Sequence, residues 1–556
     1  MRRALTTLVW IALAALVLAP LAMTLLQALF PQALSQGSWR GALAPLRQLL
    51  TPNVARELVG TLELAAEVTA IAVVLGAALA LLMVRAPPVG EAAVHGLLIT
   101  PFLIPPYLTG LAWSLLAQPR GYLDQLVGPG LSAAARVLYS PLGIALVMAL
   151  HLTPILYLAL RTALDERQSE LEFAARVHGA SPLRAFRSVT LPLVMPALAA
   201  GGLLVFLASV EEYGVPAVLG AYANLHVLTL AVDRATSVYP VRLPHAAALS
   251  SLLWGLALVA WLLYRPLARP TGQPVRRARQ PAARHLWSLL PSCGFILLAT
   301  ALPLGAIIAT SLLKAQTAGL HAGNFSLEHY RAIFAQGSSG WLALRTSLLL
   351  SVGAAVLSTA LAFAVAWVLR AGGRGSAVLD FVAALPTAMP GVVLAVALIL
   401  VWNAPWNPVP LYGRAGILLI SYTTLFLPQA LRYAQIGFAG VHSDLELAGR
   451  IHGASGLVTL RRVTLPLVLP GLLAGSAIVF GFAMRELVTS IMLQPPGVQT
   501  ISTFVFGQFE QGNPGDAMAM AVTGILTTTL LLGLFQRFEV RGDPLPAPSP
   551  TPMTSR

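Results

Sequence analysis

Twelve long apolar stretches, separated by shorter polar segments, take up most of this sequence. Hydrophobic residues make up 57% of the 556 residues, charged residues make up 10%, and the mean hydropathy is +0.77. So little charge cannot keep a chain of this size in solution, whereas about 20 consecutive apolar residues form a helix that crosses a bilayer. We therefore predict an all-α integral membrane protein with about twelve transmembrane helices. The predicted spans are Leu5–Phe30, Leu58–Val84, Ala92–Ala117, Pro141–Leu160, Leu191–Leu219, Ala246–Tyr264, Leu289–Leu313, Leu348–Leu369, Val378–Trp402, Gly416–Leu431, Leu465–Met492 and Met518–Phe535.

The first apolar stretch follows two arginines at the N-terminus, which is also the pattern of a signal peptide. It is longer than the apolar region of such peptides, and no small-residue cleavage site follows it. We therefore interpret it as the first span. The segments that connect the spans lie alternately on the two sides of the membrane. Most of the 35 Lys and Arg residues fall in the segments on the same side as the N-terminus. Because cytoplasmic loops carry this excess, both termini are predicted to be cytoplasmic.

The basic residues do not indicate nucleic-acid binding, although the net charge is +14. They are not interleaved with aromatic residues on one face, as a nucleic-acid surface requires. Cys293 is the only cysteine, so the sequence contains neither a disulfide framework nor a cysteine-based metal site. The predicted partner of most of the chain is therefore the lipid membrane.

A ten-residue motif occurs twice. The segment Glu172-Phe-Ala-Ala-Arg-Val-His-Gly-Ala-Ser recurs as Glu446-Leu-Ala-Gly-Arg-Ile-His-Gly-Ala-Ser, and both copies continue to a Val-Thr-Leu-Pro-Leu-Val run. The offset is 274 residues throughout, as from Gly179 to Gly453. Self-similarity over this distance predicts two homologous halves of six helices each. The predicted domains are residues 1–264 (core about 57–264, motif loop 172–192), a basic cytoplasmic linker 265–286, residues 287–541 (core about 342–537, motif loop 446–466) and a cytoplasmic tail 542–556.

The repeated motif has the composition of a short, rigid helix in a cytoplasmic loop. An acidic residue at its start is favoured by the helix dipole, and small residues let the helix lie close to another surface. Gly179 and Gly453 suit the left-handed turn that ends such a helix. Pro192 and Pro466 suit the first turn of the next span. A helix displayed in this way would serve as a docking element.

Both loops resemble the EAA loop of type I ABC importer permeases, and the doubled arrangement resembles the fused permeases of that family. The resemblance implies that each loop is a coupling helix, which sits in a groove of the ATPase subunit. The matching residues, with the acid of each loop, are Glu172, Ala174, Ala175, Gly179, Leu191, Pro192, Glu446, Ala448, Gly453, Leu465 and Pro466. The acid lies one position before its usual place, which Phe173 and Leu447 occupy here.

The family resemblance also implies partners and a location. We expect a separate ABC ATPase, present as a homodimer, an extracytoplasmic solute-binding protein, and a bacterial inner membrane. Lys314, the only lysine, is not part of a phosphate-binding loop, so the ATPase must be another polypeptide. We predict no catalytic residue, no metal site and no cofactor in this chain. His178 and His452 are interpreted as surface residues of the loops.

Of the charged residues within predicted spans, four form two equivalent pairs. Glu211 and Glu212 lie in the fifth span, and Arg485 and Glu486 lie at the equivalent place in the eleventh. Ionisable groups at membrane depth are costly and usually face a cavity or a partner. They are predicted to line a translocation path between the halves. The alternative is a structural ion pair, for example between Arg485 and Glu211.

The predicted function is that of a permease subunit, which is not itself an enzyme. Within the family, the segment that starts at Arg485 and the segment 500–505 most resemble the iron(III) branch. Thiamine, a polyamine or a phosphonate are the alternative solutes. The alternative class is a twelve-span secondary transporter, which would need no docking loops and whose repeats are often inverted rather than parallel.

Overall fold

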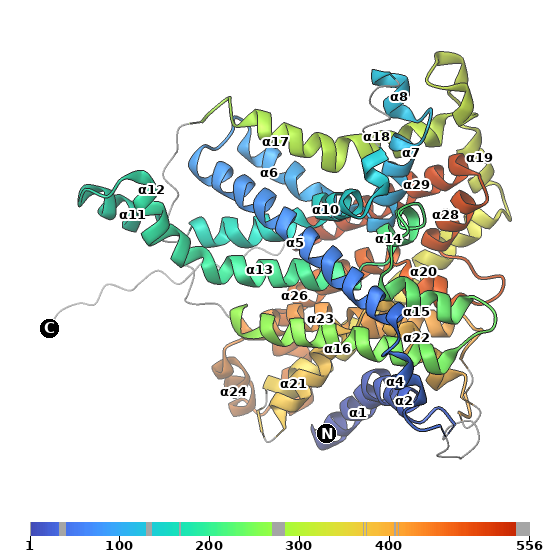
Figure 1. Ribbon diagram of the computed structural model, residues 1–556. Coiled ribbons are helices and arrows are strands. Elements are labelled where there is room, and N and C mark those ends of the chain that lie inside the picture. Colours follow the sequence, from blue (N-terminus) through green and yellow to red (C-terminus); the bar gives the residue numbers. More distant parts are fainter. Residues whose placement is uncertain are drawn as a thin grey trace.

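The computed structural model in Figure 1 describes residues 2–32, 41–128, 136–165, 168–268, 284–370, 372–373, 375–404, 407–409 and 411–540. Within these ranges the chain is helical and forms no strand beyond two isolated bridges. Most of the predicted linker 265–286 and the whole predicted tail 542–556 lie outside the described residues.

The helices of the first half, with π- and 3-10 turns labelled η, run from α1 to α16. They are α1 (Arg2–Leu13), η1 (Ala14–Leu18), α2 (Ala19–Leu29), α4 (Ala44–Gln48), α5 (Pro52–Arg85), α6 (Glu91–Ile99), η2 (Thr100–Leu103), α7 (Pro106–Ala117), α8 (Tyr122–Val127), η3 (Arg136–Tyr139), α10 (Pro141–Asp165), α11 (Gln168–Val177), α12 (Pro182–Ala185), η4 (Phe186–Thr190), α13 (Leu191–Glu211), α14 (Gly214–Leu219), α15 (Leu228–Ser237) and α16 (Leu243–Leu267).

The second half repeats this order from α17 to α29. Its elements are α17 (Leu289–Ile296), η5 (Leu297–Ala301), α18 (Leu302–Leu312), η6 (Gln316–Ala318), η7 (Ala322–Asn324), α19 (Glu328–Phe334), α20 (Ser339–Arg370), α21 (Ser376–Ala384), η8 (Leu385–Ala388), α22 (Gly391–Trp402), α23 (Gly416–Ala439), α24 (Ser443–Ile451), α25 (Gly456–Thr459), η9 (Leu460–Thr464), α26 (Leu465–Met484), α27 (Val488–Leu493), α28 (Ile501–Glu510) and α29 (Pro514–Val540).

By length and apolar composition, nine helices in the described part of the chain can cross a membrane, or eleven if each of two bent pairs is one span. The bent pairs are the predicted third and ninth spans. Their arms meet at 95° and 110°, at the proline-containing turns before α7 and α22, where proline interrupts the helical hydrogen bonds. The predicted tenth span lies in α23, which has 24 residues but is not among these nine helices.

The predicted fifth and eleventh spans are wrong in one respect, because neither is a continuous helix. In the fifth, α13 ends at Glu211 and a short helix, α14, begins at Gly214. In the eleventh, α26 ends at Met484 and α27 begins at Val488. Both breaks lie at the charged pairs Glu211–Glu212 and Arg485–Glu486, and the apolar runs resume after them, so the spans were predicted as continuous.

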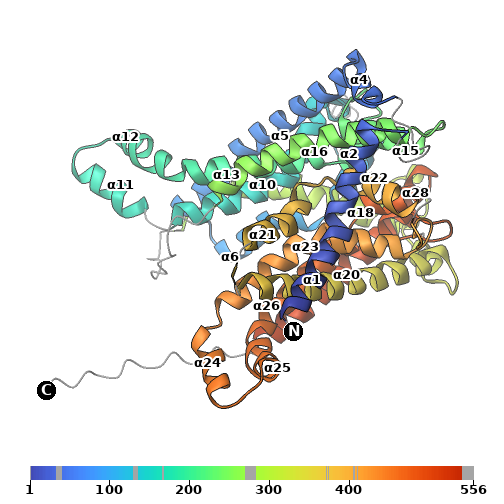
Figure 2. The ribbon, with the colours of Figure 1, turned by 90° about the horizontal axis from the view of Figure 1, so that it is seen from below.

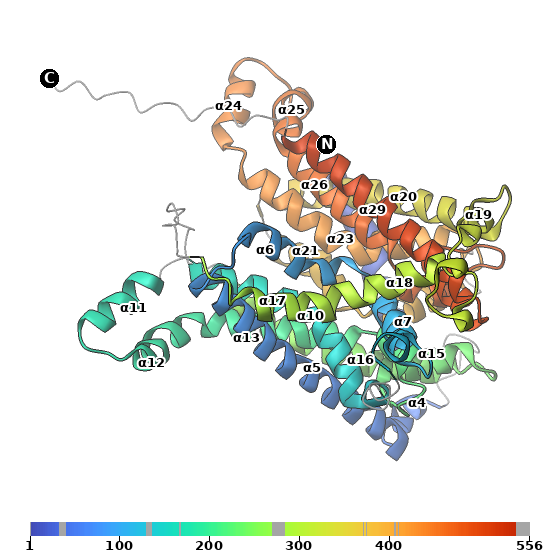
Figure 3. The same ribbon diagram turned by 90° about the horizontal axis from the view of Figure 1, so that it is seen from above.

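The first span of each half packs against the other half. The helices α1 and α2 and the turn η1 lie against α20, α21, α22 and α23, and α2 also contacts α16. The helices α17 and α18 and the turn η5 lie against α6, α7 and α10, and α18 also contacts α29. Figures 2 and 3 show these two crossings. The halves are therefore intertwined, and separating them would expose both first spans.

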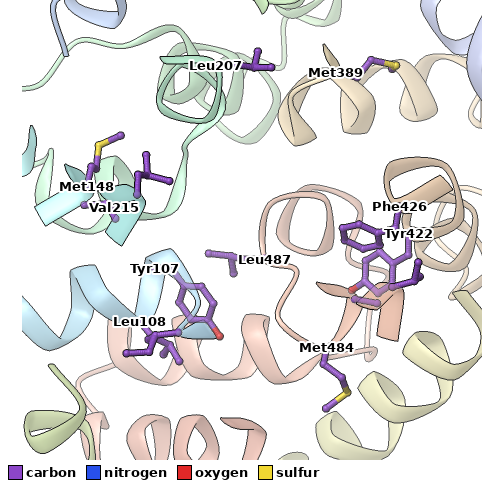
Figure 4. Close-up of a cluster of buried hydrophobic side chains, with 14 of the residues drawn as sticks. Tyr107, Leu108, Met148, Leu207, Val215, Met389, Tyr422, Phe426, Met484 and Leu487 are labelled. Atoms are coloured by element: carbon purple, nitrogen blue, oxygen red, sulfur yellow. The ribbon is translucent and has the colours of Figure 1, made fainter. Parts of the chain in front are cut away.

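The hydrophobic core is shared by the two halves. One cluster of buried side chains extends from α1 to α29, and Figure 4 shows its centre, where residues of both halves gather around the helix breaks. Tyr107, Met148 and Val215 come from the first half, and Tyr422 and Leu487 come from the second.

The two motif loops project from the same end of the molecule. In Figure 1, α11 and α12 lie on the left with α24 below them, whereas α8, α15, α19 and α28 lie on the right. We call the first the loop end and the second the opposite end. A pair of equivalent loops on one end is the arrangement that two parallel repeats predict.

Candidate functional site

The two motif loops fold in the same way. Each contains a surface helix, α11 or α24, followed by a glycine turn and a single helical turn, α12 or α25. Ser181 and Ser455 cap that turn by accepting a hydrogen bond from the backbone N–H three residues later. A π-helical turn, η4 or η9, then leads into the next span.

The glycine turns have the predicted geometry. The φ angle is +87° at Gly179 and +79° at Gly453, in the region that glycine adopts at little steric cost. The N–H of Ala180 donates to the carbonyl of Ala175 over 3.0 Å, and Ala454 donates to Gly449 over 3.0 Å. This is the bonding pattern of a glycine-terminated helix.

The prolines also lie where the motif predicts. Pro192 is in the first turn of α13, and Pro466 is in the first turn of α26, each directly after Leu191 or Leu465. Proline cannot donate to the preceding turn, and that turn is widened to π geometry in both loops.

Each loop helix presents an apolar outer face. Phe173 and Val177 are 69% and 68% exposed, and their equivalents Leu447 and Ile451 are 51% and 82% exposed. Residues four positions apart lie on one face of a helix. In the second loop, Gly449 lets α24 pack closely against α25, since a Cβ at this position would lie 3.4 Å from Thr459 Oγ1. Ala174 and Ala448 are exposed, and Ala175 is half-buried.

The acids of the motif do not lie on that outer face. The side chains of Glu172 and Glu446 are 18% and 17% exposed and turn toward the spans. The resemblance implies that they contact the ATPase, which stays a prediction; their observed partners lie within this chain.

Two of the predicted path residues hold the helix breaks. The carboxylate of Glu212 accepts hydrogen bonds from the N–H groups of Gly214 (2.8 Å) and Val215 (3.3 Å), at the start of α14. The carboxylate of Glu486 accepts from the N–H groups of Thr489 (2.9 Å) and Ser490 (3.0 Å), at the start of α27. The first N–H groups of a helix have no partner within it, and at this depth an acid supplies one.

Arg485 forms a contact between the halves. Its Nη1 donates to the carbonyl of Phe102 over 2.6 Å, and its guanidinium lies over the rings of Phe102 (5.3 Å) and Phe482 (4.6 Å). The suggested ion pair with Glu211 is wrong: among the described residues Arg485 has no acidic partner within ion-pair distance. One buried oxygen of Glu211, Oε1, has no hydrogen-bond partner among the residues that the structure describes.

The short helices that follow the breaks pack against the bent spans. A Cβ on Gly214 of α14 would lie 2.8 Å from the Cβ of Tyr107 in α7. In the other half, a Cβ on Gly391 of α22 would lie 3.1 Å from Val488 of α27. Four interrupted helices therefore meet near the centre of the molecule. Interrupted helices at membrane depth are found where a path for a solute is lined.

A cavity of about 690 Å³ lies between the halves. Asp233 of α15 and Glu510 of α28 line it from opposite halves, and the hydroxyl of Tyr213 donates to Asp233 Oδ2 over 3.2 Å. Burial raises the pKa of Asp233, and burial together with the charge of Asp233 raises the pKa of Glu510. Sequence reasoning missed both acids, because they lie outside the predicted spans and far apart in the chain. The other lining residues are Ala217, Leu230, Thr236, Ser237, Val241, Leu243, Ile399, Asn403, Tyr412, Ile491, Met492 and Phe506.

The sequence is similar to those of known transport proteins. A probable ABC transporter permease protein, y4fN, of Sinorhizobium fredii is 30% identical over 63% of this chain and 63% of its own length. The ferric transport system permease protein FbpB of Actinobacillus pleuropneumoniae is 26% identical over 80% of this chain and 65% of its own. The matched parts are thus less than two thirds of either relative.

A putative 2-aminoethylphosphonate transport system permease protein, PhnV, of Salmonella paratyphi A is 29% identical over 43% of this chain and 89% of its own length. Residues 72–272 and 356–541, one range in each half, match the family described as the binding-protein-dependent transport system inner membrane component. The chain is therefore a multi-pass membrane protein that belongs to this family of ABC transporter permeases, and it contains the family's domain twice.

Proposed function

We propose that this chain forms the complete membrane pathway of an ABC importer and is driven by a separate ATPase homodimer. The observation that carries the proposal is the pair of equivalent loops on one end, each with an exposed apolar face. Two equivalent docking elements suit a partner that is itself a dimer of identical subunits. ATP binding would close that dimer and move both loops, and the two halves would rock between inward-facing and outward-facing states.

The solute enters from the opposite end, delivered by a binding protein. The cavity with Asp233 and Glu510 lies among elements of that end, and the path would continue past the helix breaks. At the break after α26, Arg485 holds the two halves together, so its hydrogen bond to Phe102 would have to break when the halves separate. Glu211 stays a candidate path residue, with a free oxygen, whereas Glu212 and Glu486 keep the breaks in place.

The proposed solute is iron(III). FbpB relatives carry ferric transport in their names, and hard oxygen ligands such as carboxylates and phenolic oxygens suit a hard cation. A phosphonate is the second candidate, because the PhnV relative carries that solute in its name and Arg485 is a buried cation with no acidic partner in the described part of the chain. Thiamine and a polyamine stay open as alternatives. The comparisons give no support to a secondary transporter.

Orientation can be tested by cysteine labelling. In a Cys293→Ser background, a cysteine at the exposed Leu286, the last residue of the predicted linker, is expected to react only from the cytoplasm. A cysteine at Ala322 is expected to react only from outside, with a membrane-impermeant maleimide on intact cells as the probe. Reaction of Leu286→Cys from outside would contradict the orientation, including the side on which the loops lie.

The function is tested by uptake into vesicles that contain the chain, the ATPase and the binding protein. Iron(III), thiamine, spermidine and 2-aminoethylphosphonate are supplied in separate experiments. Each experiment is done once with ATP inside the vesicles and once with ATP outside them. The expected result is ATP-dependent accumulation of iron(III) alone. Accumulation of another of these solutes would leave the permease assignment standing and contradict the iron assignment.

A further inference from the structure

The acid of the first loop connects three elements of the first half. Glu172 of α11 lies 2.6 Å from Arg85 Nη2, at the end of α5, and accepts a hydrogen bond from Thr190 Oγ1 over 2.7 Å, at the start of α13. The guanidinium of Arg85 also lies over the ring of Phe186, 5.2 Å from its centre. One carboxylate thus ties the surface helix to two membrane spans.

The second half contains the same connection. Glu446 of α24 accepts from Thr464 Oγ1 over 2.9 Å and lies 3.7 Å from Arg370 Nη2, at the end of α20. Arg370 also donates to the carbonyls of Phe438 (3.0 Å) and Val441 (2.8 Å). Arg370 in α20 follows Arg85 in α5 by 285 residues, and the acids and threonines are 274 residues apart. The first offset is also that of Pro101 and Pro386. The connection is therefore part of the repeat.

The orientation of these acids separates them from the docking face. Glu172 and its neighbour Phe173 point to different sides of α11, since one side chain is 18% exposed and the other is 69% exposed. The acid is bound within its own chain, since Arg85 and Thr190 both contact its Oε2. Charge-assisted hydrogen bonds such as these hold geometry more strongly than neutral ones.

We propose that Glu172 and Glu446 are positioning residues that fix each loop helix to two spans, so that a movement of the loop moves those spans. We call each set, Glu172 with Arg85 and Thr190 and Glu446 with Arg370 and Thr464, a clamp. The inference rests on the proposed function, because it assumes that an ATPase moves the loops. Without the clamp, the loop helix could shift on its flexible glycine turn while the spans stayed in place.

The first test concerns the chain alone, in detergent or nanodiscs. Hydrogen–deuterium exchange over residues 171–178 is expected to become about tenfold faster in Glu172→Gln, because the helix loses its connection to α5. The matched control is Glu57→Gln, which removes an ion pair with Arg234 (2.9 Å) whose acid is 14% exposed and lies away from the loops. Unchanged exchange in Glu172→Gln, or equal acceleration in the control, would overturn the clamp.

The second test measures solute transported per ATP hydrolysed in the reconstituted complex. The Glu172→Gln, Glu446→Gln double variant is expected to lower this ratio about tenfold, within the usual range of coupling energies, while the ATPase still co-purifies. The exchanged pair Arg85→Glu with Glu172→Arg is expected to recover part of the ratio lost in Glu172→Arg alone. The Glu57→Gln control is expected to keep the ratio of the unmodified complex.

Three outcomes of the second test would overturn the proposal. The first is an unchanged ratio of transported solute to hydrolysed ATP in the double variant. The second is loss of the ATPase from that variant, which would place the acids at the contact with the partner. The third is a ratio in the exchanged pair that is no higher than in Glu172→Arg alone. Failure of the proposed function is distinguishable, since the unmodified complex would then show no ATP-dependent transport, while the exchange measurement on the chain alone would still report the clamp.

Discussion

Replacing Gly179 and Gly453 together with valine is expected to reduce transport-linked ATP hydrolysis about tenfold or more. Both glycines have left-handed φ angles of +87° and +79°. An L-residue there costs roughly 1–2 kcal/mol, and a β-branched residue is a clear outlier. The strain would unwind the end of each loop helix and displace its docking face, while the chain still inserts into the membrane.

Matched variants separate this effect from general damage. The Gly179→Asn, Gly453→Asn variant is expected to keep most of the activity, because asparagine tolerates the left-handed region. Gly337→Val places the same strain at φ +79°, also in open space, in the turn before α20 near the opposite end. It is expected to leave coupling intact. Normal solute-stimulated hydrolysis in the double valine variant would refute the role of the turns.

Neutralising the two acids of the cavity is expected to slow iron(III) uptake by at least tenfold. A unit charge about 8 Å from a cation contributes roughly 2 kcal/mol at an effective dielectric constant of about 20, and Asp233→Asn with Glu510→Gln removes two such charges. Glu328→Gln, an exposed acid of α19 at the same end, is the control and is expected to have no effect. Equal iron uptake in the double variant and the unmodified chain would exclude the cavity from the path.

The same acids predict a pH dependence. Because burial raises the pKa of Asp233 and of Glu510, both carboxylates become protonated at a less acidic pH than ordinary carboxyl groups. Negative charge in the cavity, and with it attraction for a cation, is therefore lost as the pH falls toward these raised values. Uptake by the unmodified complex is expected to fall more steeply with acidification than uptake by the double amide variant. Parallel pH profiles would contradict this role.

The repeat made the loops predictable, because identical local sequences with glycine and proline at fixed places specify identical local structure. The glycine turn, the serine cap and the start of the next span depend on residues within about 20 positions of one another. Apolar length likewise indicated most spans. The bends before α7 and α22 follow from prolines that are visible in the sequence, although their angles do not.

What the sequence could not show depends on contacts between distant segments. The helix breaks after Glu211 and Met484 lie at charged pairs, but the sequence does not show that Glu212 and Glu486 bind the first N–H groups of the helices that follow. The inward direction of Glu172 depends on Arg85, 87 residues away. The packing of each first span against the other half, and the position of Asp233 and Glu510 in one cavity, arise only when the halves pack together.

The central claim is that this chain is a passive pathway driven through its two loops by a separate ATPase. The most direct measurement is solute accumulation in vesicles that contain the chain with or without the ATPase, in the presence of the binding protein, and with either ATP or an imposed ion gradient. The account predicts accumulation only when the ATPase and hydrolysable ATP are both present. Accumulation by the chain without the ATPase, driven by the ion gradient, would contradict it.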